Sequence, residues 1–180
     1  ACRALAEAHA LGIVHRDVKP SNIFLLGGQA AQVKLIDFGV ARVPEPSRDA
    51  TAHGAVLGTI AYMAPEQARG AREVTPAADI FSLGCVMFEC STGKRAFSGD
   101  DVMAVLAKVL ITDLPRAREI NPKVPRALDR LISRMLSKEP QERPTALEVA
   151  RALDGLIDRT SSSGETTSGS GEKNRPRRGW

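Results

Sequence analysis

Residues 15–22 read His15-Arg16-Asp17-Val18-Lys19-Pro20-Ser21-Asn22, and the rest of the chain is best understood outward from this stretch. An apolar run at 23–26 follows it directly, then two glycines, then a second apolar run at 33–36. Two short apolar runs around a glycine-containing connection predict a small β-hairpin. The polar stretch is therefore predicted to be a loop that leads into a hairpin.

Helical patterns lie on both sides of this loop. Residues 1–12 have their apolar side chains on one face and Gly12 as a stop signal. The segment from 79 onward is apolar on every face, which predicts a helix buried in the middle of the domain. Amphipathic helices are predicted at about 100–111 and 125–137, and a last helix opens at Thr145, which has capping-box spacing to Glu148. The predicted fold class is mainly α with one small hairpin.

The composition indicates one folded domain followed by a tail. The chain has 180 residues, of which 43% are hydrophobic and 26% charged, as in ordinary globular proteins. We expect residues 1–157 to form the domain, and residues 158–180, rich in Ser and Gly with a basic end, to form a disordered tail. No run of about 18 apolar residues predicts a membrane segment.

Charge and cysteine content argue against two classes of site. The net charge is +4, and the last 21 residues hold four basic and two acidic groups, so the domain is nearly balanced and gives no reason to expect nucleic acid binding. Cys2, Cys85 and Cys90 have no metal-ligand spacing, and we expect reduced thiols in a cytoplasmic protein. The basic end of the tail is expected to be solvated, and contact with phosphate groups is the alternative.

Further motifs follow the 15–22 stretch in a fixed order. They are Asp37-Phe38-Gly39, Gly58-Thr59, Ala64-Pro65-Glu66, Asp79 at the start of the buried helix, and Arg143-Pro144. Each alone occurs by chance in many chains. Together, with a hairpin between the first two, they make residues 1–157 resemble the C-terminal lobe of a protein kinase, most similar to bacterial serine/threonine kinases. No Gly-rich phosphate loop and no Val-Ala-Ile-Lys strand is present, so the N-terminal lobe of the family is absent from this chain.

The resemblance implies catalytic chemistry for the first two motifs. Asp17 would accept the proton of the incoming hydroxyl, and Lys19 would place a positive charge beside the transferring phosphate of ATP. Asn22 and Asp37 would bind Mg²⁺ through oxygen atoms, the ligands that hard cations prefer. Phe24 would form the floor of the adenine pocket, although a simple packing residue at this position would look the same in the sequence.

Residues 37–66 resemble the activation segment of kinases, which begins at the Asp-Phe-Gly motif with Phe38 and Gly39. In the family, an arginine placed like Arg16 pairs with a phosphorylated residue of this segment. Thr51 is the favoured phosphorylation site, and Ser47 and Thr59 are further candidates. An unmodified, solvated Thr51 is the alternative.

The end of the segment carries two further expectations from the resemblance. Thr59 is expected to hydrogen-bond Asp17 and Lys19, which would indicate a Ser or Thr acceptor. Glu66 is expected to form a buried ion pair with Arg143, fastening the segment to the helical body.

Two side chains are expected to support the loop from within. His15 would pack against Phe38 and act structurally, not as a general base. Asp79 would hydrogen-bond the backbone near His15. We expect the other two histidines, His9 and His53, at the surface.

The function implied by the resemblance is transfer of the ATP γ-phosphate to Ser or Thr hydroxyls of proteins, carried out by a longer parent protein that supplies the missing N-terminal lobe. We expect this chain alone to be inactive, because the roof of the nucleotide site is absent. A kinase-like docking or regulatory module, binding a partner through residues 98–111, is one alternative. A decayed remnant with an exposed apolar face is another. A cytoplasmic location is expected, with any membrane anchor of the parent outside this chain.

Overall fold

A computed structural model describes residues 1–28, 33–38 and 58–162. In chain order the helices and strands are α1 (Cys2–Ala10), β1 (Ile23–Leu25), β2 (Val33–Leu35), α3 (Pro65–Ala68), α4 (Ala77–Thr92), α5 (Val102–Ile111), α6 (Ala117–Ile120), α7 (Arg126–Met135) and α8 (Ala146–Ser162). Short 3₁₀ turns lie at Pro20–Asn22, Leu26–Gly28 and Pro140–Glu142. The described part is thus mainly helical with one two-stranded antiparallel sheet, as predicted.

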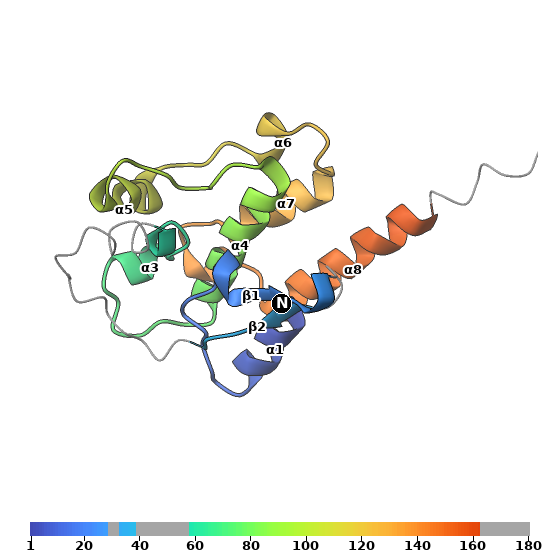
Figure 1. The fold of residues 1–180 in the computed structure, drawn as a ribbon, viewed down its shortest axis with the longest axis horizontal. Helices are drawn as coiled ribbons and strands as arrows, with labels where there is room; N and C mark the ends of the chain where they lie inside the picture. Colours follow the sequence, from blue (N-terminus) through green and yellow to red (C-terminus); the bar gives the residue numbers. More distant parts are fainter. Residues whose placement is uncertain (29–32, 39–57, 163–180) are drawn as a thin grey trace, which may run out of the picture.

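Helix α4 is the central element of the body (Figure 1). Its side chains are buried on every face, as its all-round apolar pattern predicts. Phe81 packs in one core cluster, Ile80 and Leu83 in a second, and Phe88 in a third. Because one helix contributes to all three clusters, residues along α4 have fixed positions relative to the rest of the body.

Gly84 lets α4 approach α7 closely. A Cβ atom built at Gly84 would lie 3.0 Å from Cβ of Met135 and 3.2 Å from side-chain atoms of Leu136. At such separations the neighbours would have to shift, since interiors are packed about as densely as organic crystals. Glycine at this position therefore sets the spacing between α4 and α7.

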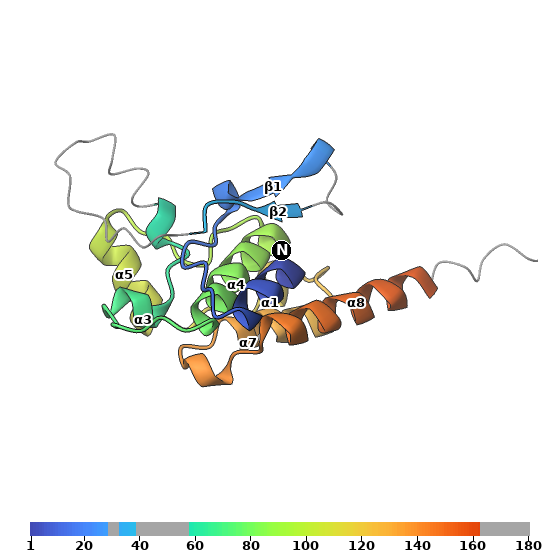
Figure 2. The same ribbon diagram turned by 90° about the horizontal axis from the view of Figure 1, so that it is seen from below.

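The hairpin lies along one side of the helical body (Figure 2). Ile23 pairs with Leu35, Phe24 with Lys34, and Leu25 with Val33. Ile23 and Leu35 pack against the core, whereas Phe24 and Leu25 remain 55% and 44% exposed. The hairpin therefore contacts the body near its base and presents apolar side chains to solvent farther along.

Helix α8 starts with a reciprocal cap and extends beyond the rest of the body (Figure 1). The Thr145 amide donates to the Glu148 carboxylate at 2.7 Å, and the Glu148 amide donates to Thr145 Oγ1 at 3.3 Å, which confirms the predicted capping box. The hydrogen bonds from Thr145 lower the pKa of Glu148. The helix runs to Ser162, five residues past the predicted domain end at 157.

The sequence patterns located the long elements well and missed the short ones. Helices α5 and α7 lie inside the predicted ranges, while α4 begins two residues before 79. One-turn helices α3 and α6 were not predicted, because four residues are too few to show a helical period. Among the described helices, none has both the length and the apolar character that a membrane crossing requires.

Candidate active site

Asp79 holds the backbone of the 15–22 loop from inside the body. Its fully buried carboxylate accepts hydrogen bonds from the His15 amide on Oδ2 at 2.8 Å and from the Arg16 amide on Oδ1 at 2.7 Å, which confirms the predicted contact.

His9 also contacts this carboxylate, with Nε2 2.8 Å from the same Oδ2. The expectation that His9 is a surface residue was wrong, because its side chain is only 11% exposed. His9 follows the buried Leu5 by four residues on α1, a spacing that marks the same helix face and could have located it.

Two residues of the site have left-handed backbone conformations. Arg16 has φ of 66° and Asp37 has φ of 56°, and they are the only non-glycine residues with positive φ among those described. Such a conformation costs on the order of 1–3 kcal/mol and persists only where surrounding contacts enforce it. At Arg16 the enforcing contact on the amide side is the short hydrogen bond to Asp79.

His15 is buried and uses both ring nitrogens. Nδ1 accepts the Asp17 amide at 3.3 Å, which places the proton on Nε2, and Nε2 then donates to the Ile36 carbonyl oxygen at 3.1 Å. The ring also packs against Phe38, with 4.6 Å between centroids, as expected. A histidine with both nitrogens engaged in this way links the loop to the strand end and is not available as a general base.

Asp17, Lys19, Asn22 and Thr59 come together at the surface of the loop. Lys19 Nζ lies 2.8 Å from Asp17 Oδ2 and donates to Thr59 Oγ1 at 3.1 Å. Asn22 Nδ2 donates to the Asp17 carbonyl at 2.8 Å and to Asp17 Oδ2 at 3.1 Å. Both side chains therefore contact Oδ2.

The cluster leaves Asp17 partly exposed and buries Asn22 beneath it. The Asp17 side chain is 34% exposed, so a substrate can reach it, and the Lys19 ammonium lies 2.8 Å from its Oδ2. Asn22 is 5% exposed, and both of its amide hydrogens are directed at Asp17. The Asn22 amide oxygen is consequently the atom left to contact a cation.

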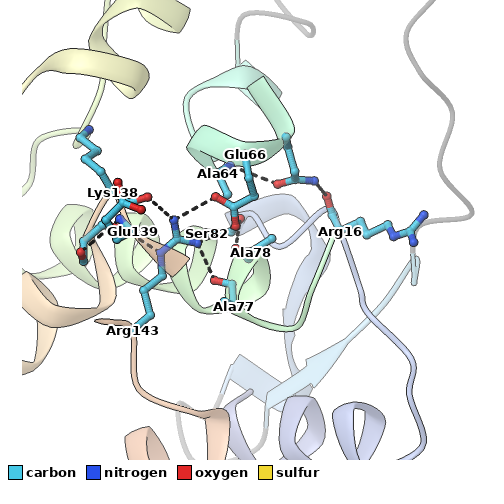
Figure 3. A network of polar contacts seen from close by, with 11 residues as sticks. Arg16, Ala64, Glu66, Ala77, Ala78, Ser82, Lys138, Glu139 and Arg143 are labelled. Atoms are coloured by element: carbon cyan, nitrogen blue, oxygen red, sulfur yellow. Dashed lines mark hydrogen bonds and ion pairs between the residues drawn. The ribbon is translucent and has the colours of Figure 1, made fainter. Parts of the chain in front are cut away.

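The predicted ion pair between Glu66 and Arg143 is present and bidentate (Figure 3). Arg143 Nη1 lies 2.7 Å from Glu66 Oε1, and Nη2 lies 2.9 Å from Oε2. The Arg143 side chain is completely buried, donates also to the carbonyls of Ala77, Ser137 and Lys138, and lies 4.9 Å from the Phe81 ring centroid. All donors of this guanidinium are thus used to join α3 to α4 and to the turn before α8.

Several predicted site residues are not part of this cluster. Phe24 is exposed on β1, and Asp37 and Phe38 follow β2 at the exposed edge of the hairpin. Gly39, Ser47, Thr51 and His53 lie outside the described residues. A hollow of about 660 Å³ lies between α7 and the 112–117 loop, and none of the predicted site residues lines it. In the described parts of the chain, no three His, Cys, Asp or Glu side chains gather as a metal site.

Two residues of the neighbourhood were missed by sequence analysis. Gln67 on α3 donates from Nε2 to the Arg16 carbonyl at 3.0 Å. Tyr62 donates to Glu89 Oε2 at 2.5 Å, and burial, followed by this hydrogen bond, raises the pKa of Tyr62 above its usual range. Nothing in the local sequence pattern of either residue identifies its partner, since Gln67 and Arg16 are 51 positions apart.

Comparison with known proteins gives a consistent result. A family model described as protein kinase domain matches residues 1–152. The chain is 40% identical over 152 residues to the serine/threonine-protein kinase Pkn1 of Myxococcus xanthus, covering 83% of this chain and 22% of the relative. It is 40% identical over 154 residues to the serine/threonine-protein kinase PknB of Mycobacterium leprae, covering 85% of this chain and 24% of the relative.

One relative carries a different substrate class in its name. The tyrosine-protein kinase MasK of Myxococcus xanthus is 41% identical over 162 residues, covering 89% of this chain and 24% of the relative. The chain spans about a fifth to a quarter of the length of these relatives.

Proposed function

The chain belongs to the protein kinase domain family, and on that premise we propose that it supplies the catalytic loop of an enzyme that transfers the γ-phosphate of ATP to Ser or Thr hydroxyls of proteins. The contact set of Asp17 carries this proposal. Its carboxylate is reachable from solvent, has a cation 2.8 Å away, and is fixed through Asn22. Phosphoryl transfer depends mostly on such positioning and on electrostatic stabilisation.

Asp17 and Lys19 would share the chemistry at the acceptor. Asp17 Oδ1 accepts the proton of the attacking hydroxyl and orients its oxygen toward the phosphate. Lys19 places positive charge where negative charge develops on the phosphate oxygens, a form of stabilisation that preorganised groups supply effectively. Since Lys19 also bonds Asp17 and Thr59, its ammonium is held in place before substrate arrives.

The residues present fit a magnesium ion bound together with ATP. Asn22 offers its amide oxygen and Asp37 its carboxylate, and both are hard oxygen donors. Mg²⁺ usually takes only one or two protein carboxylates and completes its shell with phosphate oxygens and water, so the lack of a three-carboxylate cluster in the described residues is compatible with it. Bound Mg²⁺ would supply neutralisation of the phosphate charge.

The Lys19–Thr59 hydrogen bond supports a Ser or Thr acceptor, and the similarity to MasK makes tyrosine the second candidate. The two acceptors differ in length, because the tyrosine hydroxyl extends several ångströms farther from the backbone. Peptide libraries with a single Ser, Thr or Tyr acceptor separate these cases. We expect phosphate incorporation on Ser and Thr only, and incorporation on Tyr alone would favour the second candidate.

We further propose that the described body is a C-terminal lobe and that an N-terminal lobe packs on its exposed hairpin edge. Phe24, Leu25, Ile36 and Phe38 are each at least 40% exposed there, and patches of this kind mark interaction surfaces. Phe24 would then lie under adenine. A non-catalytic docking module is the alternative, in which the α5 region binds a partner without turnover, and a decayed remnant is the third possibility.

Regulation by phosphorylation is proposed for the segment between Asp37 and Glu66. The Arg16 side chain is exposed, and within the described ranges it forms no ion pair, so it can pair with a phosphorylated residue such as Thr51. The Glu66–Arg143 pair would fix the end of this segment to the body. A cytoplasmic location is part of the proposal, because reduced cysteines such as Cys2, Cys85 and Cys90 are usual in that compartment.

The test is phosphate transfer from labelled ATP to a basic protein, using the natural protein that contains this chain and, in parallel, the 180-residue chain alone. Asp17→Asn is expected to lower kcat of the natural protein by about 10²–10⁴-fold. Asp158→Asn, an exposed aspartate on α8, is the matched control and should leave kcat unchanged. Full activity of the Asp17 variant would overturn the catalytic proposal. Transfer by the isolated chain would overturn its expected inactivity.

A further inference from the structure

We infer that Gln67 is a positioning residue that fixes the Arg16–Asp17 peptide group and thereby makes the orientation of Asp17 depend on the placement of α3. The inference rests on the proposed function only for its kinetic consequence. Its structural part, the coupling between α3 and the loop, concerns contacts in this chain alone.

The Gln67 side chain contacts two backbone groups at once. Its Oε1 accepts the Ala64 amide at 3.1 Å, which caps α3, and its Nε2 donates to the Arg16 carbonyl at 3.0 Å. The contact that ends on Arg16 is drawn in Figure 3. One amide side chain therefore joins the first turn of α3 to the catalytic loop.

The peptide group it contacts is one that needs support. Arg16 has left-handed φ, a conformation that a non-glycine residue keeps only when its neighbours enforce it. Asp79 fixes the Arg16 amide on one side of this residue. On the other side, the peptide leading into Asp17 is held at its N–H by His15 Nδ1, at the long distance of 3.3 Å, and at its carbonyl by Gln67.

Without the Gln67 donor, this peptide would keep only the long hydrogen bond to His15. Rotation of the peptide plane changes ψ of Arg16 and φ of Asp17, and so changes where the Asp17 carboxylate points. Small misplacements of a catalytic group have large kinetic effects. Gln67 thus acts on the reaction through the backbone, without touching substrate.

The same side chain makes α3 a reference point for the loop. Glu66, the residue before Gln67, is fixed to the body by the bidentate pair with the buried Arg143. When α3 is in place, its Gln67 amide meets Arg16, and when α3 moves, this contact is lost. The position of α3 therefore affects Asp17 through one hydrogen bond, from Gln67 to the Arg16 carbonyl.

A simpler role for Gln67 is capping of α3 alone, and a pair of variants distinguishes the two. Gln67→Glu keeps an oxygen for the Ala64 amide and removes the donor to Arg16. Gln67→Lys keeps a donor that can reach the Arg16 carbonyl and removes the acceptor for Ala64. Gln141→Glu and Gln141→Lys, made at an exposed glutamine that contacts Glu139, control for the change in charge.

In the natural protein, Gln67→Glu is expected to lower kcat about five- to tenfold, the effect of one hydrogen bond, with KM for ATP unchanged. Gln67→Lys should retain at least half of the wild-type kcat. The Gln141 variants should match wild type. The inference is overturned if Gln67→Glu has wild-type kcat, or if Gln67→Lys is as impaired as Gln67→Glu.

Amide hydrogen exchange in the same proteins gives a readout that needs no activity. Gln67→Glu should speed exchange of the Asp17 amide and spare that of Ala64, and Gln67→Lys should show the opposite pattern. If the wild-type protein transfers no phosphate and the two variants still show this crossed pattern, the proposed function fails and the coupling stands. If Asp17 exchange is unchanged in Gln67→Glu, the coupling fails whatever the activity.

Discussion

The two sides of the 15–22 loop are held in very different ways. On the side of α4, the loop backbone is fixed by the buried carboxylate of Asp79, which itself contacts His9. On the side of the hairpin, Phe24 and Phe38 are 55% and 42% exposed. The helical body therefore fixes the loop by polar contacts inside a closed core, while the hairpin edge presents apolar surface that no described residue covers.

This difference separates a part of the structure that is held in place by its own contacts from a part that is left exposed. The orientation of Asp17 depends on contacts that the body makes with itself, so it can be preformed. The apolar hairpin edge has the character of an interface, because removing apolar surface from water lowers the free energy by about 25 cal/mol per Å². Substitutions in the body should therefore change folding stability strongly, and substitutions at the edge should change association.

The largest effect is expected from the buried ion pair of the body. Arg143→Ala should lower the free energy of unfolding by about 3–5 kcal/mol, because it leaves the Glu66 carboxylate and three backbone carbonyls without their donor. Urea denaturation measures this loss. Arg3→Ala is the matched control, since the Arg3–Asp154 pair has side chains 77% and 51% exposed and should contribute less than about 1 kcal/mol. Equal losses for the two variants would contradict the division between body and surface.

Asp79→Asn is expected to cost about 2–3 kcal/mol, because the amide nitrogen cannot accept a backbone N–H and a charge-assisted hydrogen bond is lost. Exchange of the His15 and Arg16 amides should accelerate at the same time. Asp129→Asn provides a comparison at another buried aspartate, which accepts the Arg118 amide far along the chain. It should lower stability and leave the His15 and Arg16 amides protected; acceleration in both variants would mean that the loop reports only global stability.

A smaller loss is expected where α4 meets α7. Gly84→Ala should cost about 1–3 kcal/mol, since the added methyl group would lie 3.0 Å from Met135 Cβ. Gly155→Ala on α8 makes the same chemical change with no atom within 4 Å, and should stabilise the helix by about 0.5–1 kcal/mol. Denaturation midpoints compare the two. Opposite signs are expected, and a loss at Gly155 would contradict the open surroundings of that helix position.

The smallest change in folding is expected at the hairpin edge. Phe24→Ser should alter the free energy of unfolding by less than about 0.5 kcal/mol, because the side chain is more exposed than buried. Self-association of the 180-residue chain, measured by sedimentation velocity, should decrease. Met103→Ser, at a 72% exposed position on α5, should decrease it less. A stability loss above 1 kcal/mol for Phe24→Ser would mean that this edge belongs to the folded core.

Much of the fold followed from local patterns, because α5, α7 and α8 have apolar residues at helical spacing. Helix α4 was recognised from its apolar residues on every face, and the hairpin from two apolar runs around glycines. The short helices α3 and α6 escaped because a single turn shows no period. The contact between His9 and Asp79 was not predicted, because the two residues are 70 positions apart.

The part of the site that could be recognised in the sequence is the part that the kinase-like motifs contain. The residues that meet around Asp17, and the pairing of Glu66 with Arg143, were expected from the resemblance to kinases. The roles assigned to Asp17, Asn22 and Asp37 remain predictions, and Thr51 and Gly39 lie outside the described residues. The chain order of the motifs gave no indication that Gln67 would reach the loop.

The family, the helical class, the hairpin and the identity of the chemical groups could be read from the sequence, because they depend on local pattern and on residue type. Which of these groups touch one another depends on the packing of the helices. Left-handed Arg16 is stable because Asp79 and Gln67, from two different helices, meet its two sides, and His15 is excluded as a base because both its nitrogens find partners. Hydrogen bonds act over about 3 Å. Contacts between residues 50 to 80 positions apart therefore depend on how the helices pack, and a short stretch of sequence does not show this.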